Sequence, residues 1–136
     1  MTEVKNNPLI IFPNSFAICK LAPDLPIPDW AQSSQITASV RTVDELSVVC
    51  EDRFVPPDAK FEPGWRVIKV QGPLDFSFVG VLASISAPLA KAGISIFVVS
   101  TYDTDYFLVK EIDLDKAVKV LVSEGFLVLN DVRLSS

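Results

Sequence analysis

The chain has 136 residues, of which 49% are hydrophobic and 21% are charged, and its 12 basic and 17 acidic side chains give a net charge of −5. A chain of this length buries roughly two-thirds of its unfolded surface, which is enough for one compact unit or for two very small ones. Because the sequence contains no histidine, it excludes a Ser-His-Asp or Cys-His nucleophile, a histidine metal site and an imidazole pH switch.

The composition also restricts the partners and the location that we expect. The acidic balance argues against nucleic acid, which is bound by clustered Lys and Arg side chains. Two cysteines are too few for a zinc site of the usual kind, and we expect no metal and no cofactor. The first residues lack the pattern of a signal peptide, and the apolar stretches are shorter than the ~18 residues that cross a bilayer. These features predict a cytoplasmic protein without a membrane partner.

The first half of the chain predicts short strands separated by prolines. Leu9–Phe12 is an apolar run that stops at the turn signal Pro13-Asn14, and Phe16–Leu21 is expected to form a separate strand. Three prolines between Ala22 and Pro28 then exclude a strand, and Asp29–Gln32 predicts a single helical turn.

A β-hairpin and a linker complete this half. Ile36–Val40 and Leu46–Cys50 flank a polar segment and predict the two strands of the hairpin. Phe54–Pro63 contains three prolines and is the best candidate for a linker. Cys19 and Cys50 both lie in apolar strands, and we expect buried, reduced thiols at neighbouring positions.

The second half opens with a predicted strand and helix. Trp65–Gln71 is rich in β-branched residues, which favour a strand. Phe78–Ala92 predicts a helix, with Gly93 as its C-terminal stop. The apolar stripe of this helix consists of Phe78, Val81, Leu82, Ile85, Leu89 and Ala92. Pro88 predicts a kink or a broken last turn, because proline removes a helical hydrogen bond.

A hairpin, a second helix and a last strand follow. Ile94–Ser100 and Asp105–Val109 predict strands that are joined by the turn Thr101–Thr104. Asp113 is placed to cap a helix, and Phe126–Leu129 predicts the final strand. The apolar positions of this helix are Leu114, Ala117, Val118, Leu121 and Val122.

These elements predict an α+β protein. Residues 65–129 have the order β-α-β-β-α-β, which is the ferredoxin-like arrangement of four antiparallel strands with two helices on one face. The first half looks like a shortened copy, since Thr42–Asp44 matches Thr101–Asp103 at an offset of 59 residues. We therefore expect a degenerate unit at residues 8–63 and a complete unit at residues 64–130, side by side.

Three segments of the second half carry a family resemblance. Asp75–Ile85, Pro88–Ile96 and Ser100–Val109 together resemble the ACT domain, and above all the ACT units of the aspartate-kinase type and of cytosolic arginine sensors. The resemblance extends over residues 65–127. It implies a tandem ACT protein that regulates without catalysing, and that binds an amino acid at an interface between two units. The degenerate unit at residues 8–63 is then ACT-like as well.

A site for such a ligand is expected where the first helix of this half begins. The unpaired N–H groups at Gly80 and the positive helix end suit an α-carboxylate, and the loop Gly72–Val79 leaves room for it. Asp105 suits an α-ammonium group or a cationic side chain, and the resemblance makes it a ligand contact. The expected ligand-binding residues are Phe78, Val79, Gly80, Val81, Leu82, Thr101, Tyr102 and Asp105.

The same residues also have simpler interpretations. Gly80 is alternatively a turn glycine, Asp105 a solvated hairpin residue, and Tyr102 a packing residue. Matching arginine sensors carry an acidic residue just ahead of the glycine, whereas this chain has Phe78 and Val79 there, which favours a neutral or apolar amino acid.

The alignment of the two halves bears on assembly and on function. Leu46 stands in the first half where Asp105 stands in the second, so a site that needs two competent units predicts a two-fold homodimer. The leading hypothesis is an amino-acid-binding sensor that acts alone or through an enzyme that it regulates. The alternatives are a structural assembly module without a ligand and a small enzyme on the same scaffold.

Overall fold

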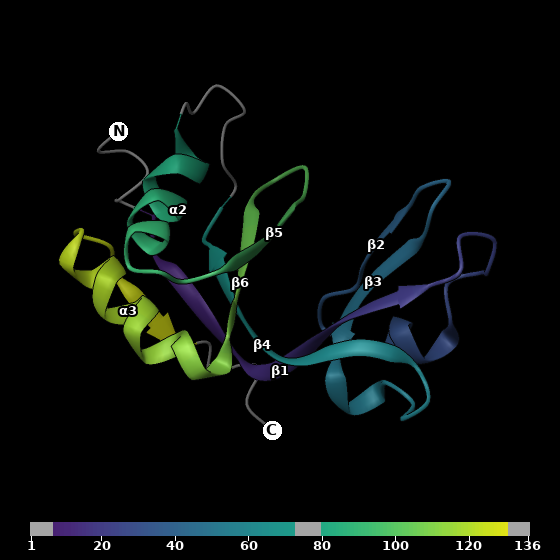
Figure 1. The fold of residues 1–136 in the computed structure, drawn as a ribbon. Coiled ribbons are helices and arrows are strands. Elements are labelled where there is room, and N and C mark those ends of the chain that lie inside the picture. The colour runs from purple at the N-terminus through teal and green to yellow at the C-terminus, as the bar shows by residue number, and fades with distance from the viewer. Residues whose placement is uncertain (1–6, 73–79, 131–136) are drawn as a thin grey trace. The chain divides into compact units, whose positions relative to one another are not determined.

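The computed structural model describes residues 7–72 and 80–130, and Figure 1 shows its helices and strands. Contacts within the chain divide it into two compact units. The helical unit consists of residues 1–13 and 66–136, and the small unit consists of residues 14–65. Each unit is described separately below.

The helical unit contains the β-α-β-β-α-β order that the second half of the sequence predicts. Its elements in chain order are β4 (Lys60–Val70), α2 (Val81–Lys91), β5 (Ile96–Ser100), β6 (Asp105–Lys110), the 3-10 turn η3 (Glu111–Asp113), α3 (Leu114–Ser123) and β7 (Val128–Asn130). Strands β5 and β6 form an antiparallel hairpin in which Ser100 pairs with Asp105. The kind and order of these elements are thus confirmed, while several of their ends differ by a few residues.

A strand from the N-terminal half also belongs to this sheet. The hydrogen-bonded neighbours run in the order β5-β6-β4-β1-β7, so β1 (Leu9–Leu21) lies between β4 and β7. Leu9–Ile11 pair in parallel with Val128–Asn130. The expectation that all strands are antiparallel is therefore wrong at this edge. Pairing between segments more than 100 residues apart leaves no local signal in a sequence.

Strand β1 continues through the predicted turn at Pro13-Asn14, and the prediction of two separate strands is wrong. The strand pairs with β7 at Leu9–Ile11 and with β3 at Phe16–Leu21. Pro13 lies between these two stretches, where neither pairing requires its missing N–H. Proline is therefore tolerated at the point where β1 exchanges one partner for another.

Strand β4 begins at Lys60, so the prediction of a linker over Phe54–Pro63 is wrong for its last four residues. In the small unit the strand order is β2-β3-β1-β4, which makes this part of β4 an edge strand. An edge strand accepts proline because one side of its backbone has no partner that needs an N–H. Pro63 is accordingly exposed.

The small unit repeats the element order of the helical unit with single turns in place of helices. Its elements are β1, the 3-10 turn η1 (Asp29–Ser33), β2 (Ala38–Arg41), β3 (Leu46–Glu51), the 3-10 turn η2 (Asp52–Phe54) and the first part of β4. The predicted hairpin is confirmed, with Arg41 opposite Leu46. The predicted helical turn is confirmed as η1, whose Ala31 is fully buried.

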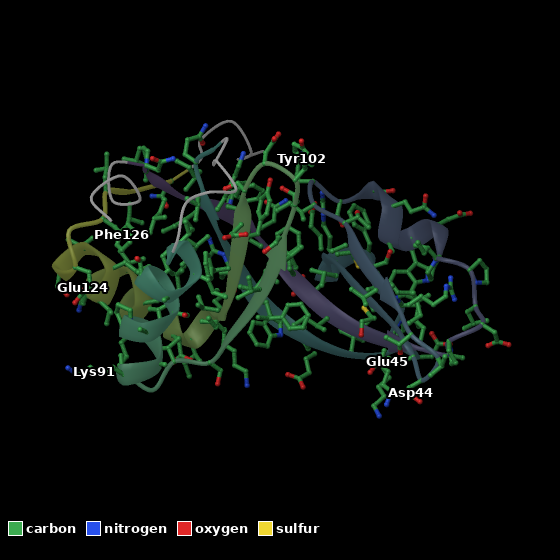
Figure 2. All side chains as sticks on the ribbon, turned by 90° about the horizontal axis from the view of Figure 1, so that it is seen from above. Asp44, Glu45, Lys91, Tyr102, Glu124 and Phe126 are labelled. Atoms are coloured by element: carbon green, nitrogen blue, oxygen red, sulfur yellow. The ribbon has the colours of Figure 1, made fainter. Side chains whose placement is uncertain are left out.

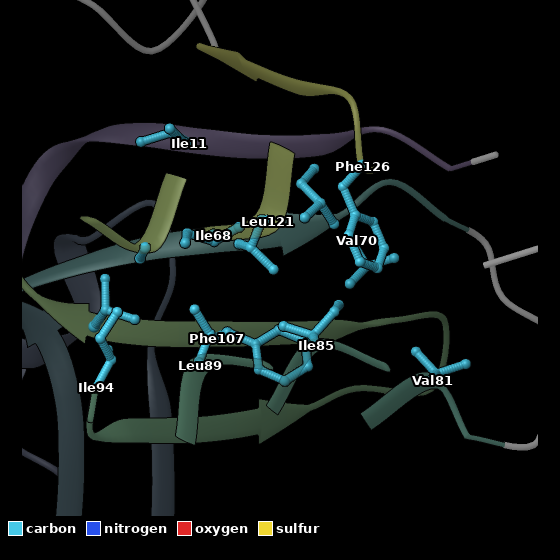
Figure 3. Packing of buried hydrophobic residues seen from close by; sticks show 13 residues of the cluster. Ile11, Ile68, Val70, Val81, Ile85, Leu89, Ile94, Phe107, Leu121 and Phe126 are labelled. Atoms are coloured by element: carbon cyan, nitrogen blue, oxygen red, sulfur yellow. The ribbon is translucent and has the colours of Figure 1, made fainter. Parts of the chain in front are cut away.

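The core of the helical unit lies between its helices and one face of its sheet (Figure 3). Helix α2 contributes Val81, Ile85 and Leu89 at a spacing of four residues, and α3 contributes Ala117 and Leu121. Full burial of each large aliphatic side chain stabilises the fold by roughly 1.5–3 kcal/mol. The strands contribute Leu9, Ile11, Ile68, Val70, Phe107 and Val109 to the same core.

Both helices end in the same hydrogen-bonded motif. Ile94 N donates to Leu89 O at 3.0 Å, and Phe126 N donates to Leu121 O at 3.1 Å. In each pair both side chains are buried, which is the hydrophobic contact typical of this helix end. The predicted break at Pro88 is wrong, because Ala92 N donates to Pro88 O at 3.1 Å and the last turn remains intact. Proline has no backbone N–H to donate, but its carbonyl oxygen can still accept a hydrogen bond.

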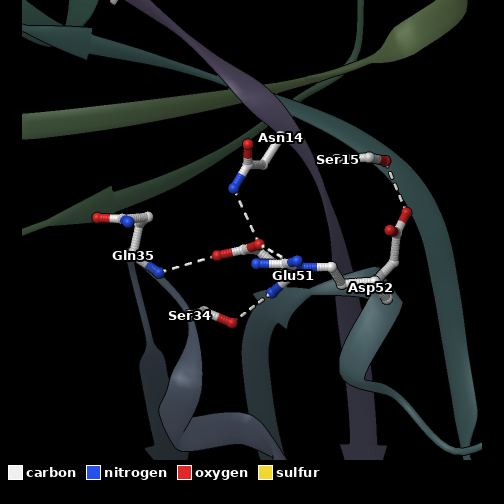
Figure 4. Close-up of polar contacts among 7 residues, drawn as sticks. Asn14, Ser15, Ser34, Gln35, Glu51 and Asp52 are labelled. Atoms are coloured by element: carbon white, nitrogen blue, oxygen red, sulfur yellow. Dashed lines mark hydrogen bonds and ion pairs between the residues drawn. The ribbon is translucent and has the colours of Figure 1, made fainter. Parts of the chain in front are cut away.

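A buried carboxylate organises one end of the small unit (Figure 4). Glu51 is only 1% exposed, and it accepts hydrogen bonds from Asn14 Nδ2 at 2.9 Å and from Gln35 N at 3.0 Å. Arg53 Nε contacts it at 2.9 Å and supplies a positive charge. Its own N–H donates to Ser34 Oγ at 2.7 Å. The sequence analysis assigned no role to this residue.

The two cysteines lie in the core of the small unit, as predicted. Cys19 and Cys50 are free and buried on the adjacent strands β1 and β3, within one cluster of apolar side chains. The hydrogen bond with Cys19, followed by burial, raises the pKa of Cys50 well above its usual range. The Cys50 thiol is therefore protonated at neutral pH.

Candidate functional site

Gly80 is the N-cap residue of helix α2. The ligand site is expected at this helix start. Gly80 has φ 86° and ψ 10°, a left-handed conformation that side chains with a Cβ rarely adopt. Its carbonyl accepts from Ser84 N at 2.8 Å and from Ser84 Oγ at 2.7 Å. The N-cap residue Gly80 has no side chain with which to cap the helix, and the first turn contains no acidic residue. The N–H groups at a helix start of this kind can bind an anion.

The predicted site residues around Gly80 have different environments. Val81 is 8% exposed, and its side chain packs in the core. Only its backbone is therefore placed to contact a ligand. Leu82 is 50% exposed on the surface of α2. Phe78 and Val79 lie outside the described residues. At this end of α2 the backbone is therefore the group best placed to hold a ligand carboxylate.

The turn between β5 and β6 carries the other predicted site residues. Thr101 N donates to Thr104 O at 2.8 Å, and Thr101 Oγ1 accepts from Thr104 N at 3.2 Å. Tyr102 is 82% exposed at the tip of this turn, where Figure 2 labels it. The Thr101 side chain thus closes the turn, and Tyr102 presents its ring at the surface.

Asp105 is the first residue of β6 and is partly buried. Side chains alternate along a strand, so Asp105 lies on the same face as Phe107 and Val109, which pack in the core beneath the helices. Within residues 7–72 and 80–130, no hydrogen bond or ion pair engages its carboxylate. A partly buried carboxylate is well suited to bind an ammonium group.

One hydrogen bond connects the turn between β5 and β6 to the end of β4. Thr104 is 5% exposed, and its Oγ1 donates to Val70 O at 2.5 Å. Val70 is the last residue of β4, and it shares the core with Val81 (Figure 3). The start of α2, the end of β4 and the start of β6 therefore lie at one end of the helical unit. Thr104 was expected only as a turn residue, because a bond across 34 residues has no local sequence signal.

The small unit repeats the turn but not the carboxylate. Thr42 N donates to Glu45 O at 2.8 Å, and Thr42 Oγ1 accepts from Glu45 N at 3.1 Å, as Thr101 does with Thr104. The two turns that the sequence matches therefore share the same hydrogen bonds. At the position of Asp105 the small unit has Leu46, which is 1% exposed and packs in its core.

Two features of the described residues concern other kinds of function. No group of three or more His, Cys, Asp or Glu side chains in this part of the chain is arranged to hold a metal ion. Neither described α-helix is long and apolar enough to cross a membrane.

Parts of this chain are similar in sequence to known proteins. A 58-residue stretch is 40% identical to subunit 1 of the cytosolic arginine sensor for mTORC1 from Homo sapiens, and equally to that from Bos taurus. The stretch covers 42% of this chain but only 18% of those relatives. A protein of Agobacterium tumefaciens with a crystal structure is 39% identical, with a TM-score of 0.87 over 92% of this chain and 93% of its own.

More distant structures share the fold alone. The regulatory subunit of aspartate kinase from Thermus thermophilus superposes with a TM-score of 0.59 over 82% of this chain and 92% of its own, at 10% identity. A family model described as an N-terminal domain matches residues 14–58, and the model described as the ACT domain matches residues 60–123. Residues 60–123 therefore belong to the ACT domain family.

Proposed function

We propose that this protein is a non-catalytic regulator that binds an amino acid at the Gly80–Asp105 end of its helical unit. The observation that carries the proposal is the placement of two complementary groups at one end of this unit. The N–H groups at the start of α2 suit the α-carboxylate, and the carboxylate of Asp105 suits the α-ammonium group. Membership of residues 60–123 in the ACT family and the likeness to a named arginine sensor support this role.

Binding of this kind depends on matching both ends of a zwitterion. Backbone N–H groups at a helix start donate to a carboxylate without needing a basic side chain. Asp105 neutralises the ammonium charge in a partly buried position, where charge pairs are stronger than in water. No bond in the ligand has to break, so the site serves recognition alone.

We further propose that the ligand is a neutral or apolar amino acid. Phe78 and Val79 occupy the positions where related arginine sensors carry an acidic residue, and an apolar pair does not balance a guanidinium. The exposed Leu82 and Tyr102 supply apolar surface for a ligand side chain. The expected side-chain contacts of the ligand are therefore Phe78, Val79, Leu82, Thr101 and Tyr102.

The proposal extends to the architecture of the chain. We propose two ferredoxin-like ACT units, a degenerate one at residues 8–63 and a complete one at residues 64–130. The small unit has Leu46 in place of Asp105, so it offers no second competent site. A second copy of the chain would supply the missing half, and the proposed assembly is a two-fold homodimer. The named cytosolic relative supports a cytoplasmic location, and the regulated partner is proposed to be an enzyme.

A thermal-shift screen with the twenty standard L-amino acids tests this function. A ligand present at 100 times its dissociation constant adds about 2.7 kcal/mol to the free energy of unfolding, which raises the melting temperature by several degrees. We expect at least one neutral amino acid to produce such a shift and its D-enantiomer to produce none. Twenty flat responses at 10 mM would refute the proposed function.

A further inference from the structure

Thr104 is one of only two polar residues that are buried among those the structure describes, the other being Glu51. Its hydroxyl donates to Val70 O at 2.5 Å, and its backbone carbonyl accepts from Thr101 N at 2.8 Å. Thr104 therefore joins the β5–β6 turn to the end of β4. A buried bond of this kind fixes the relative position of the two segments, because breaking it leaves a carbonyl without a partner.

The small unit shows that this bond is not needed to close the turn. There the same turn is closed by Thr42, and the position of Thr104 is occupied by Glu45. Glu45, labelled in Figure 2, is partly buried, and its side chain accepts from Ser47 Oγ of β3 at 3.0 Å. The Thr104 hydroxyl is thus an additional feature of the one unit that also carries Asp105.

The end of β4 is held from its other side as well. Gln71 N donates to Pro8 O at 2.9 Å, and Gln71 O accepts from Asn7 Nδ2 at 2.7 Å. Val70 and Gln71 are therefore fixed by partners on both neighbouring segments. From this fixed point the chain continues toward Gly80 and α2.

We propose that Thr104 is a positioning residue for the amino-acid site, which holds Asp105 and Tyr102 in place relative to the end of β4. The inference rests on the proposed function, because it assigns to Thr104 a part in that same site. Thr104 acts through the turn and does not itself contact the ligand. Its loss is expected to displace Asp105 from the ammonium group while the turn stays closed by Thr101.

Three variants of the full chain test this role by titration calorimetry, with the amino acid that shifts the wild-type melting temperature most as the probe. Thr104→Val keeps the shape of the side chain and removes the hydroxyl, and Thr104→Ser keeps the hydroxyl. Thr37→Val is the matched control, because Thr37 Oγ1 donates to Ala31 O at 2.9 Å in the small unit. Amide hydrogen exchange at Thr101 reports whether the turn remains closed.

We expect Thr104→Val to weaken binding at least tenfold with Thr101 still protected, while Thr104→Ser and Thr37→Val stay within threefold of wild type. Affinity within threefold of wild type in a folded Thr104→Val chain overturns the inference and leaves the proposed function standing. If Thr104→Val does not fold, Thr104→Ala decides by the same criterion. If the wild-type chain binds none of the twenty amino acids, the proposed function fails and this inference fails with it.

Discussion

The turns that join β2 to β3 and β5 to β6 share a backbone and differ in their side chains. Thr42 and Thr101 make the same hydrogen bonds, and a match of three residues in the sequence was enough to predict the equivalence. The differences at Glu45 and Leu46, compared with Thr104 and Asp105, separate a structural turn from a candidate site. At the scale of single residues, function therefore depends on side chains that the shared turn does not require.

Glu51 has the strongest expected effect on stability of any polar side chain in the small unit. Replacing Glu51 with Ala removes the acceptor of hydrogen bonds from Asn14, Gln35 and Arg53 and leaves a gap at a buried position. We expect the free energy of unfolding in urea to fall by about 2–3 kcal/mol. Asp44→Ala, at an exposed position of the same unit, is the control and is expected to change it by under about 0.5 kcal/mol. Equal effects of the two changes would contradict this role for Glu51.

The thiols of Cys19 and Cys50 provide a second measurement at this scale. Both are buried, and the hydrogen bond with Cys19 together with burial raises the pKa of Cys50. Because the thiolate is the reactive form, we expect negligible labelling of Cys50 by iodoacetamide at pH 8 in the folded chain. Both cysteines should be labelled in 8 M urea. Rapid labelling without denaturant, read by mass spectrometry, would show that the core of the small unit opens readily.

At the scale of elements, regular spacing made helices and hairpins predictable. The stripes of α2 and α3 and the alternation in β5 and β6 are local patterns, so a sequence reveals them directly. The course of β1 through Pro13 and the extension of β4 through Pro63 were missed, because both depend on which neighbour pairs with each side of the strand. The intact last turn after Pro88 was missed for a related reason, since its carbonyls find partners beyond the helix.

The C-terminus of α2 gives a prediction about one such element. Gly93 has φ 79°, and a Cβ added there would meet no atom within 4 Å, so a substitution acts only through backbone strain. We expect Gly93→Ala to lower the free energy of unfolding by about 1–2 kcal/mol. Gly93→Asn should cost less, because asparagine tolerates this conformation better than alanine. Urea unfolding of both variants checks the order, and a larger loss in Gly93→Asn would contradict it.

At the scale of the whole molecule, the shared strand β1 explains why the boundaries of the units are hard to read from the sequence. Residues 9–13 precede the small unit in the chain but belong to the helical unit, where Leu9–Ile11 pair with β7. Contact between the two ends of the chain is a long-range feature, and no composition shift marks it. The candidate site was easier to predict, because Gly80 and Asp105 lie in segments that resemble a known family.

The oligomeric state of the whole molecule is also predicted. The small unit has no counterpart of Asp105, so the proposed site requires a second chain. Sedimentation velocity of the wild-type chain at about 20 μM is expected to give a dimer, and added ligand should stabilise it at lower concentrations. A monomer that still binds the amino acid with full affinity would show that one chain forms the complete site.

The central claim is that Asp105 binds the ammonium group of an amino acid. Titration calorimetry of Asp105→Ala, beside Asp103→Ala as a control in the same turn, tests it most directly. Loss of the charged partner is expected to cost about 1.5–3 kcal/mol of binding, a tenfold to hundredfold weakening, with an unchanged melting temperature. The control should bind like the wild type, because Asp103 is exposed. Wild-type affinity in a folded Asp105→Ala chain would contradict the claim and place the ligand elsewhere.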